Sequence, residues 1–198
     1  MEKEIERKYA IETIPENLKI EKIVYIEQAY LYHDSHTTIR IRRIEPINKK
    51  QSIYVYTIKT TGDIHYENNS KIGKKYEIEN RISQEEYNQL LSKKISELVC
   101  KTRIVSPIAN NLKAEIDIYY HQLEDLLTLE IEFQNEEQAN NFLKPDWIGK
   151  ELGYQELSNR KLAELTREEL LQKMTKEEME KNQKNIQKLK EKFNLNSY

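Results

Sequence analysis

The sequence contains a single cysteine, four glycines and four prolines among its 198 residues. One cysteine excludes a disulfide scaffold within the chain and any zinc site built from several thiolates. The few glycines form neither G-x-G-x-x-G nor G-x-x-x-x-G-K-[ST], so the two common backbone cradles for nucleotide phosphates are missing. Any phosphate would therefore have to be bound by side chains.

Long hydrophobic runs and an excess of charge of one sign are also missing. No apolar run approaches the roughly 20 residues of a membrane span, and the N-terminus lacks the apolar stretch of a secretory signal. The 32 basic and 34 acidic residues leave a net charge of −2, which argues against a protein that coats nucleic acid or an anionic membrane. We expect a cytoplasmic protein, monomer or homodimer, without nucleic-acid or membrane partners.

What the chain has in abundance is tyrosine, with 13 residues, and short segments that alternate apolar and charged residues. Alternation with a period of two predicts β-strands. Eight such segments occur, at residues 3–11, 24–32, 37–44, 52–60, 74–82, 99–105, 113–120 and 127–133. Helices are expected over 83–97, 135–142, 156–172 and 173–192. The last is so highly charged that a solvated tail is favoured over a helix for a partner or a dimer.

The charged side chains fall on one face of almost every predicted strand. One solvated face of an antiparallel sheet would explain any single strand. However, residues of the same sign recur two positions apart, as in Arg40 and Arg42 or Glu130 and Glu132. Like charges repel, so ordinary surface patterning gives no reason for these pairs.

An antiparallel barrel with apolar faces outward against helices and charged faces inward accounts for the pattern. Its lumen would hold eight acids (Glu4, Glu6, Glu77, Glu79, Glu115, Asp117, Glu130 and Glu132) and seven bases (Lys8, Arg40, Arg42, Lys59, Lys75, Lys101 and Arg103). Clustered bases suit a polyanion, and clustered carboxylates suit a hard cation such as Mg²⁺ or Mn²⁺. The sequence therefore predicts a site for a metal-complexed polyphosphate.

The segment from Glu4 to Lys8 resembles the E-x-E-x-K signature of the CYTH superfamily, the triphosphate tunnel metalloenzymes. The charged pairs at 40/42, 77/79, 101/103, 115/117 and 130/132, with Thr57 and Lys59 between the first two pairs, follow in the family's order, and Trp147 to Glu151 and Ser158-Asn159 come after them. The resemblance covers about residues 2–165. It implies a mainly β (α+β) fold, with an eight-stranded antiparallel tunnel over residues 1–165, helices outside it, and a C-terminal helical extension over 166–198.

The resemblance also implies roles for individual residues. Glu4, Glu6 and Glu132 would hold a first Mg²⁺ or Mn²⁺, and Asp117 and Glu130 a second. The residues expected to contact phosphate are Lys8, Arg40, Arg42, Lys59, Lys75, Lys101 and Arg103. The candidate catalytic residues are Glu130, Glu132 and Lys101, with the glutamates positioning or deprotonating the attacking water.

The chain departs from the family pattern at Lys74-Lys75, Glu151 to Gly153 and Glu156-Leu157, which leaves the substrate preference open. Hydrolysis of inorganic triphosphate to pyrophosphate and phosphate ranks first, because it needs nothing beyond the charges present. The alternatives are a thiamine triphosphatase, a class IV-type adenylate cyclase and a module that binds polyphosphate without cleaving it. Cys100 is expected to be a buried structural thiol.

Overall fold

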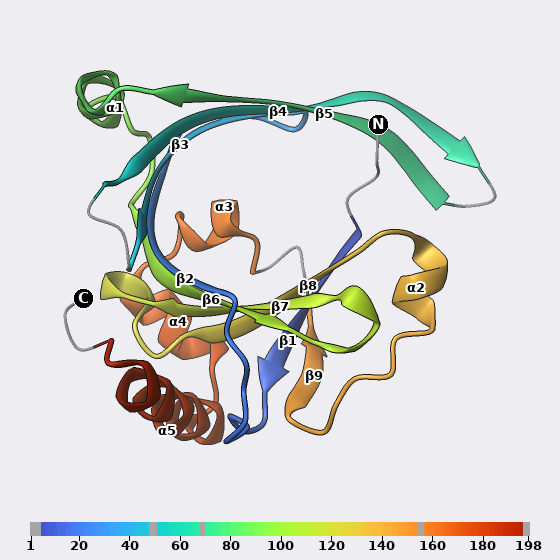
Figure 1. Cartoon of the computed structure of the whole chain (residues 1–198). Coiled ribbons are helices and arrows are strands. Elements are labelled where there is room, and N and C mark those ends of the chain that lie inside the picture. Colours follow the sequence, from blue (N-terminus) through green and yellow to red (C-terminus); the bar gives the residue numbers. More distant parts are fainter. Residues whose placement is uncertain (1–4, 48–50, 68–69, 154–156, 196–198) are drawn as a thin grey trace.

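A computed structural model (Figure 1) describes residues 5–47, 51–67, 70–153 and 157–195, and only the backbone over 61–67 and 70–75. Within these ranges the strands form one antiparallel sheet in the order β5-β4-β3-β2-β6-β7-β8-β1-β9. The strands are β1 (Ile5–Ile11), β2 (Lys22–His33), β3 (Thr37–Pro46), β4 (Ile53–Glu67), β5 (Ser70–Ile82), β6 (Val99–Pro107), β7 (Lys113–Tyr119), β8 (Leu127–Phe133) and β9 (Ile148–Leu152). The prediction of a mainly antiparallel β fold is confirmed.

The expected closed barrel of eight strands is corrected to an open, strongly curved sheet. In Figure 1 the strands β2 to β5 arch over the half formed by β6, β7, β8 and β1. In the expected eight-stranded barrel β5 would pair with β1. In the structure β9 takes that edge of β1, so β5 and β9 are the edge strands, and the described residues contain no pairing between them.

Strand β9 is not among the eight strands predicted from the sequence. The strand has only five residues, too few to show a clear period. Gly149 serves the close approach to β1, because a Cβ at this position would lie 3.1 Å from the carbonyl oxygen of Ala10. The glycine therefore permits strand pairing here.

The helices in the described ranges are α1 (Gln84–Leu91), α2 (Glu136–Asn140), α3 (Asn159–Leu162), α4 (Arg167–Lys173) and α5 (Lys176–Phe193), with short 3₁₀ turns η1 (Ala109–Asn111) and η2 (His121–Leu123). The helix expected over 156–172 is divided into α3 and α4. The division falls at Thr166, whose side chain caps the backbone of Glu169 and starts a new helix. No helix among these is long and apolar enough to cross a bilayer.

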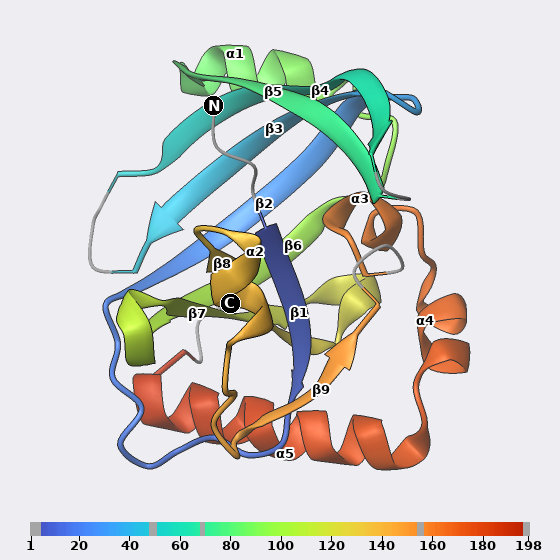
Figure 2. The same cartoon turned by 90° about the vertical axis from the view of Figure 1, so that its right-hand side faces the viewer.

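The prediction that the C-terminal helix is a solvated tail is wrong. Leu189 and Leu195 are fully buried in the same core cluster as Ile11 and Ile14 of the N-terminal region. Figures 1 and 2 show α5 lying along the side of the sheet that faces away from the arch. Part of its buried face is polar, so the apolar pattern understated the packing: Asn185 donates to the Ile11 carbonyl at 3.2 Å.

Candidate active site

The concave side of the sheet encloses a cavity of about 300 Å³ with an almost entirely polar wall. It is lined by Glu6, Ile26, Gln28, Arg40, Arg42, Lys59, Glu77, Lys101, Arg103, Glu115, Glu130, Glu132, Ser158 and Asn159. Each of the strands β1 to β8 contributes at least one of these side chains. The others come from the start of α3, which Figure 1 shows on the concave side. Most of the charges predicted to share a lumen therefore meet in one cavity.

Strand alternation fixes the direction of the two arginines on β3. Between them Ile41 is fully buried on the outer face, where it packs in one cluster with Ala29 and Tyr87 of α1. Because successive side chains of a strand point to opposite faces, burying Ile41 outside directs Arg40 and Arg42 into the cavity.

The arginines of the arch are partly paired with acids of β5. Arg40 lies 3.6 Å from Glu77, and Arg42 is hydrogen-bonded to Glu79. Lys59 of β4 shares Glu77, at 2.9 Å. Burial and the neighbouring charge of Arg40 lower the pKa of Arg42, against the opposing pull of Glu79.

The Nε atoms of Arg40 and Arg42 are both buried and have no hydrogen-bond partner in the described structure. A buried donor without an acceptor carries a desolvation cost of about 1–3 kcal/mol, more for a charged group. An anion in the cavity would supply the missing acceptors and relieve the repulsion between the two guanidinium groups. The arch is thus arranged to receive negative charge.

On the opposite wall Arg103 of β6 is the centre of an ion-pair network. Its guanidinium donates to both oxygens of Asp117, at 2.7 and 2.6 Å, to Glu130 at 2.6 Å, and to Glu115. Although burial opposes it, the charge of Asp117 raises the pKa of Arg103 well above its usual value. Burial raises the pKa of Glu115, against the lowering effect of Arg103.

Two buried lysines complete this wall. Lys8 is fully buried and lies 2.8 Å from Glu130, while Lys101 is 3% exposed and lies 2.6 Å from Asp117. Burial and the charge of Arg103 lower the pKa of Lys101 to about 8, against the attraction of Asp117. Burial would raise the pKa of Glu130, but the charges of Lys101, Lys8 and Arg103 hold it well below its usual range.

The carboxylates Glu6 and Glu132 face each other directly across the β1–β8 pair and both line the cavity. Such a pair of oxygen donors fits a hard divalent cation, which would offset the repulsion between them. In the described ranges no ready-made group of three or more His, Cys, Asp or Glu side chains is arranged around a metal position. Glu4, the third expected ligand, lies outside these ranges.

Three further predicted residues stand apart from the cavity surface. Lys8 and Asp117 are fully buried behind it, where Asp117 is the counter-ion of Lys101 and Arg103. The assignment of Asp117 to a metal stays a prediction. Lys75 pairs with Thr61 across β4 and β5, and its side chain is outside the description.

Sequence reasoning missed the contribution of the segment before α3. Ser158 and Asn159 line the cavity, the Asn159 side chain accepts from Lys101 at 3.2 Å, and the Leu157 carbonyl accepts from Lys8 at 2.6 Å. The signal was present, because a Ser-Asn pair before a short apolar stretch is a typical helix start. The Ser-Asn pair indicates the N-terminal cap of a helix, but it does not indicate contacts with the distant lysines.

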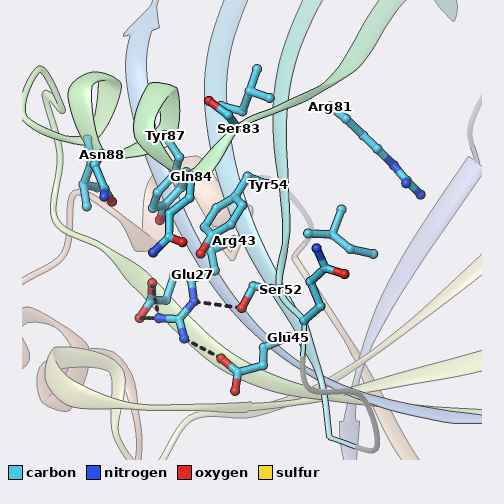
Figure 3. Close-up of a pocket in the computed structure, with 14 residues that line it drawn as sticks. Glu27, Arg43, Glu45, Ser52, Tyr54, Arg81, Ser83, Gln84, Tyr87 and Asn88 are labelled. Atoms are coloured by element: carbon cyan, nitrogen blue, oxygen red, sulfur yellow. Dashed lines mark hydrogen bonds and ion pairs between the residues drawn. The ribbon is translucent and has the colours of Figure 1, made fainter.

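A larger hollow, of about 1080 Å³, lies on the outer face between α1 and the ends of β3 and β4. Figure 3 shows Arg43 held there between Glu27 and Glu45. The hollow is lined by two carboxylates, Glu27 and Glu45, and two arginines, Arg43 and Arg81, so it has no excess of positive charge for a polyanion. Arg43 directly follows Arg42 in the chain, so adjacent arginines serve opposite faces of β3.

No family model matches the sequence. A curated relative, the inorganic triphosphatase of Nitrosomonas europaea, is 27% identical over 149 residues, which are 75% of this chain and 88% of that protein. A crystal structure of the inorganic triphosphatase NE1496 is similar with a TM-score of 0.57 and 27% identity, over 82% of this chain and 95% of its own.

A second structure of NE1496, described as a hypothetical protein, has a TM-score of 0.58 and 26% identity over 83% of this chain and 99% of its own. The protein PH1012 from Pyrococcus horikoshii OT3 shares the fold, with a TM-score of 0.50 and 20% identity over 85% of this chain and 99% of its own.

Proposed function

We propose, on the basis of its relationship to the CYTH-like triphosphate tunnel family, that this chain is a triphosphatase that cleaves inorganic triphosphate to pyrophosphate and phosphate. The relationship and the name of the relative, inorganic triphosphatase, support the reaction class. The observation that carries the proposal to this chain is the pair of buried, unpartnered Nε donors of Arg40 and Arg42 in a polar cavity.

In this proposal the triphosphate lies between two basic walls. Arg40, Arg42 and Lys59 bind it from the arch, and Lys101 and Arg103 bind it from β6 on the opposite wall. Phosphoryl transfer depends mainly on positioning and on stabilising the charge of the phosphate oxygens. Cations fixed by the ion pairs described above provide both without reorganising during the reaction.

The two glutamates of β8 have different tasks. Glu130 is strongly ionised by its three cationic neighbours, so it is a weak base and acts by holding Lys8 and Arg103 in position. Glu132 lines the cavity on the same face of the strand but is more exposed, so it is the carboxylate that accepts the proton of the attacking water.

The acid set fits a divalent cation, which we assign to Glu6 and Glu132, with Glu4 as the sequence-predicted third ligand. When bound, Mg²⁺ or Mn²⁺ supplies Lewis-acid neutralisation of phosphate oxygens and a lowered pKa of coordinated water. A second ion at Asp117 and Glu130 would compete with the ion pairs that these residues make with Lys101, Lys8 and Arg103.

Inorganic triphosphate ranks first among substrates because of the cavity's size and lining. Its volume of about 300 Å³ is modest, and Ile26 is its one apolar lining residue in the described structure. Among the described residues no aromatic side chain lines it on which a purine or thiazole ring would stack. A nucleoside or thiamine group would thus gain little from this wall.

The test is phosphate release from tripolyphosphate, ATP and thiamine triphosphate with Mg²⁺ or Mn²⁺, with cyclic AMP measured in parallel and EDTA as the control. We expect the highest kcat/KM for tripolyphosphate and no turnover in EDTA. Cyclic AMP from ATP with intact tripolyphosphate would establish the cyclase alternative. Binding of tripolyphosphate by calorimetry without consumption of any substrate would establish the binding module.

A further inference from the structure

The ammonium group of Lys101 is held between a charged and a neutral oxygen. It donates to Asp117 Oδ2 at 2.6 Å and to the side-chain oxygen of Asn159 at 3.2 Å. The two residues are 58 positions apart, so only the fold brings them together. Both Lys101 and Asn159 line the cavity that the proposed function assigns to triphosphate.

The position of Asn159 is fixed by the packing of its helix. Ser158 caps α3 by accepting from the backbone of Lys161. The next turn inserts Leu162 and Ala163, both buried, into the core cluster that contains Tyr30. Asn159 is therefore presented to Lys101 from an anchored turn and carries little freedom of its own.

We propose that Asn159 is a positioning residue for triphosphate binding, which holds the Lys101 ammonium toward the cavity. This inference rests on the proposed function. An ammonium has three donors, and the described hydrogen bonds of Lys101 use two of them, on Asp117 and Asn159, while the group also lies 5.4 Å from the centre of the Tyr119 ring. The third is available to a phosphate oxygen. Without the amide oxygen, the flexible lysine stem would relax onto Asp117.

The neutral character of the acceptor is central to this role. A carboxylate in place of Asn159 would orient the ammonium equally well but would cancel its charge toward the phosphate. The same segment holds the second buried lysine in the same manner, because the uncharged Leu157 carbonyl accepts from Lys8. Neutral oxygens of residues 157–159 thus fix both lysines without weakening the positive wall.

The test is a double-mutant cycle read by calorimetric binding of imidotriphosphate, a non-hydrolysable analogue, so that no turnover is needed. We expect Asn159→Ala to weaken binding about tenfold, the scale of one hydrogen bond to a charged group. In a Lys101→Ala background the same change should alter binding less than twofold, because the group it positions is gone. In tripolyphosphate hydrolysis, Asn159→Ala should raise KM more than it lowers kcat.

Two further variants serve as controls for a folding defect. Asn159→Asp keeps the size and the hydrogen bond, and we expect it to bind more weakly than Asn159→Ala. Lys161→Ala removes an exposed cation from the same helix, whose ion pair among the described residues is with Glu164, and should leave affinity unchanged.

Equal losses from Asn159→Ala with and without Lys101, or tighter binding by Asn159→Asp, would overturn the inference while leaving the proposed function intact. Failure of the unmodified protein to bind either imidotriphosphate or tripolyphosphate would overturn the proposed function and this inference together.

Discussion

Adjacent arginines of β3 experience opposite environments. Arg42 faces the cavity with a buried Nε atom that has no hydrogen-bond partner among the described residues, whereas Arg43 faces outward and is held by Glu27 and Glu45. The two residues are adjacent in the chain, and their side chains point to opposite faces of the sheet. They form a matched pair for asking whether the inner face alone binds the substrate.

We expect Arg42→Ala to lower kcat/KM for tripolyphosphate. The loss should correspond to about 2–5 kcal/mol of transition-state stabilisation, the scale of truncating one member of a desolvated charge pair. Arg42→Lys should recover only part, since the planar fork of donors is lost. Arg43→Ala, measured in the same steady-state assay, should leave kcat/KM within about twofold. A comparable loss in both alanine variants would show that the cavity is not the substrate site.

Glu6 lies directly across the β1–β8 pair from a second acidic residue, Glu132. We expect Glu6→Gln to weaken metal binding, because a neutral amide is a poorer ligand for a hard cation. The measurement is the increase in Tm on adding Mn²⁺, together with the Mn²⁺ concentration that half-activates hydrolysis. Glu12→Gln is the control: it removes a carboxylate paired with Lys181 of α5, outside the cavity lining. An unchanged Mn²⁺ response in Glu6→Gln would refute the metal assignment.

Among the elements, α5 has one of its contacts with the sheet at its first turn. Thr175 and Glu178 form a reciprocal capping box, and Lys150 of β9 donates to Glu178 at 2.6 Å. The bond to Lys150 and the capping interaction with the Thr175 backbone lower the pKa of Glu178 to about 2. One carboxylate thus joins an edge strand to the C-terminal helix.

This pKa determines how stability should depend on pH. A carboxyl group with a depressed pKa in the folded state stabilises the protein above the unfolded value, here 4.5, and this contribution is lost as the pH falls toward about 2. We expect Glu178→Gln to lower the free energy of unfolding by about 0.5 kcal/mol at pH 7, as for other exposed ion pairs. Urea denaturation should show the difference from the unmodified protein shrinking below pH 4.5.

The matched control is Glu177→Gln, which also removes a first-turn carboxylate of α5 but none of the bonds to Lys150 or Thr175. A pH-independent difference for Glu178→Gln, or an equal pH dependence for both variants, would contradict the assignment.

For the molecule as a whole, the C-terminal segment and the N-terminal strand share one core. Leu189 and Leu195 are buried with Ile11 and Ile14, although the sequence predicted a boundary between residues 165 and 166. That boundary stays a prediction about domains. The shared core nevertheless gives it a direct test, since an independent extension would contribute nothing to the unfolding of the sheet.

We expect Leu189→Ala to lower the free energy of unfolding by about 2–5 kcal/mol, because it leaves a cavity in a packed core. Urea unfolding should remain a single transition by both tyrosine fluorescence and circular dichroism. Leu143→Ala is the control, because Leu143 is 90% exposed, and it should change stability by less than about 0.5 kcal/mol. Two separated transitions, or no cost for Leu189→Ala, would favour the boundary.

The sequence by itself determined which side chains share a strand face. Alternation is a local property of extended backbone, so the common direction of Arg40 and Arg42 and the eight main strands could be predicted without knowing their partners. The charged pairs likewise predicted a polyanion site, since same-sign neighbours need an external counter-charge.

Only the tertiary structure decided what lies opposite those faces. The five-residue strand β9 pairs with the free edge of β1, so that β5 and β9 are the edges of the sheet, and neither the brevity of β9 nor its glycine predicted this pairing. Besides Leu189, the buried face of α5 contains asparagines that donate to distant carbonyls, and a hydrophobic pattern does not reveal such contacts. Asn159 reaches Lys101 for the same reason: contacts between segments far apart in sequence depend on strand register and helix packing, which no local pattern contains.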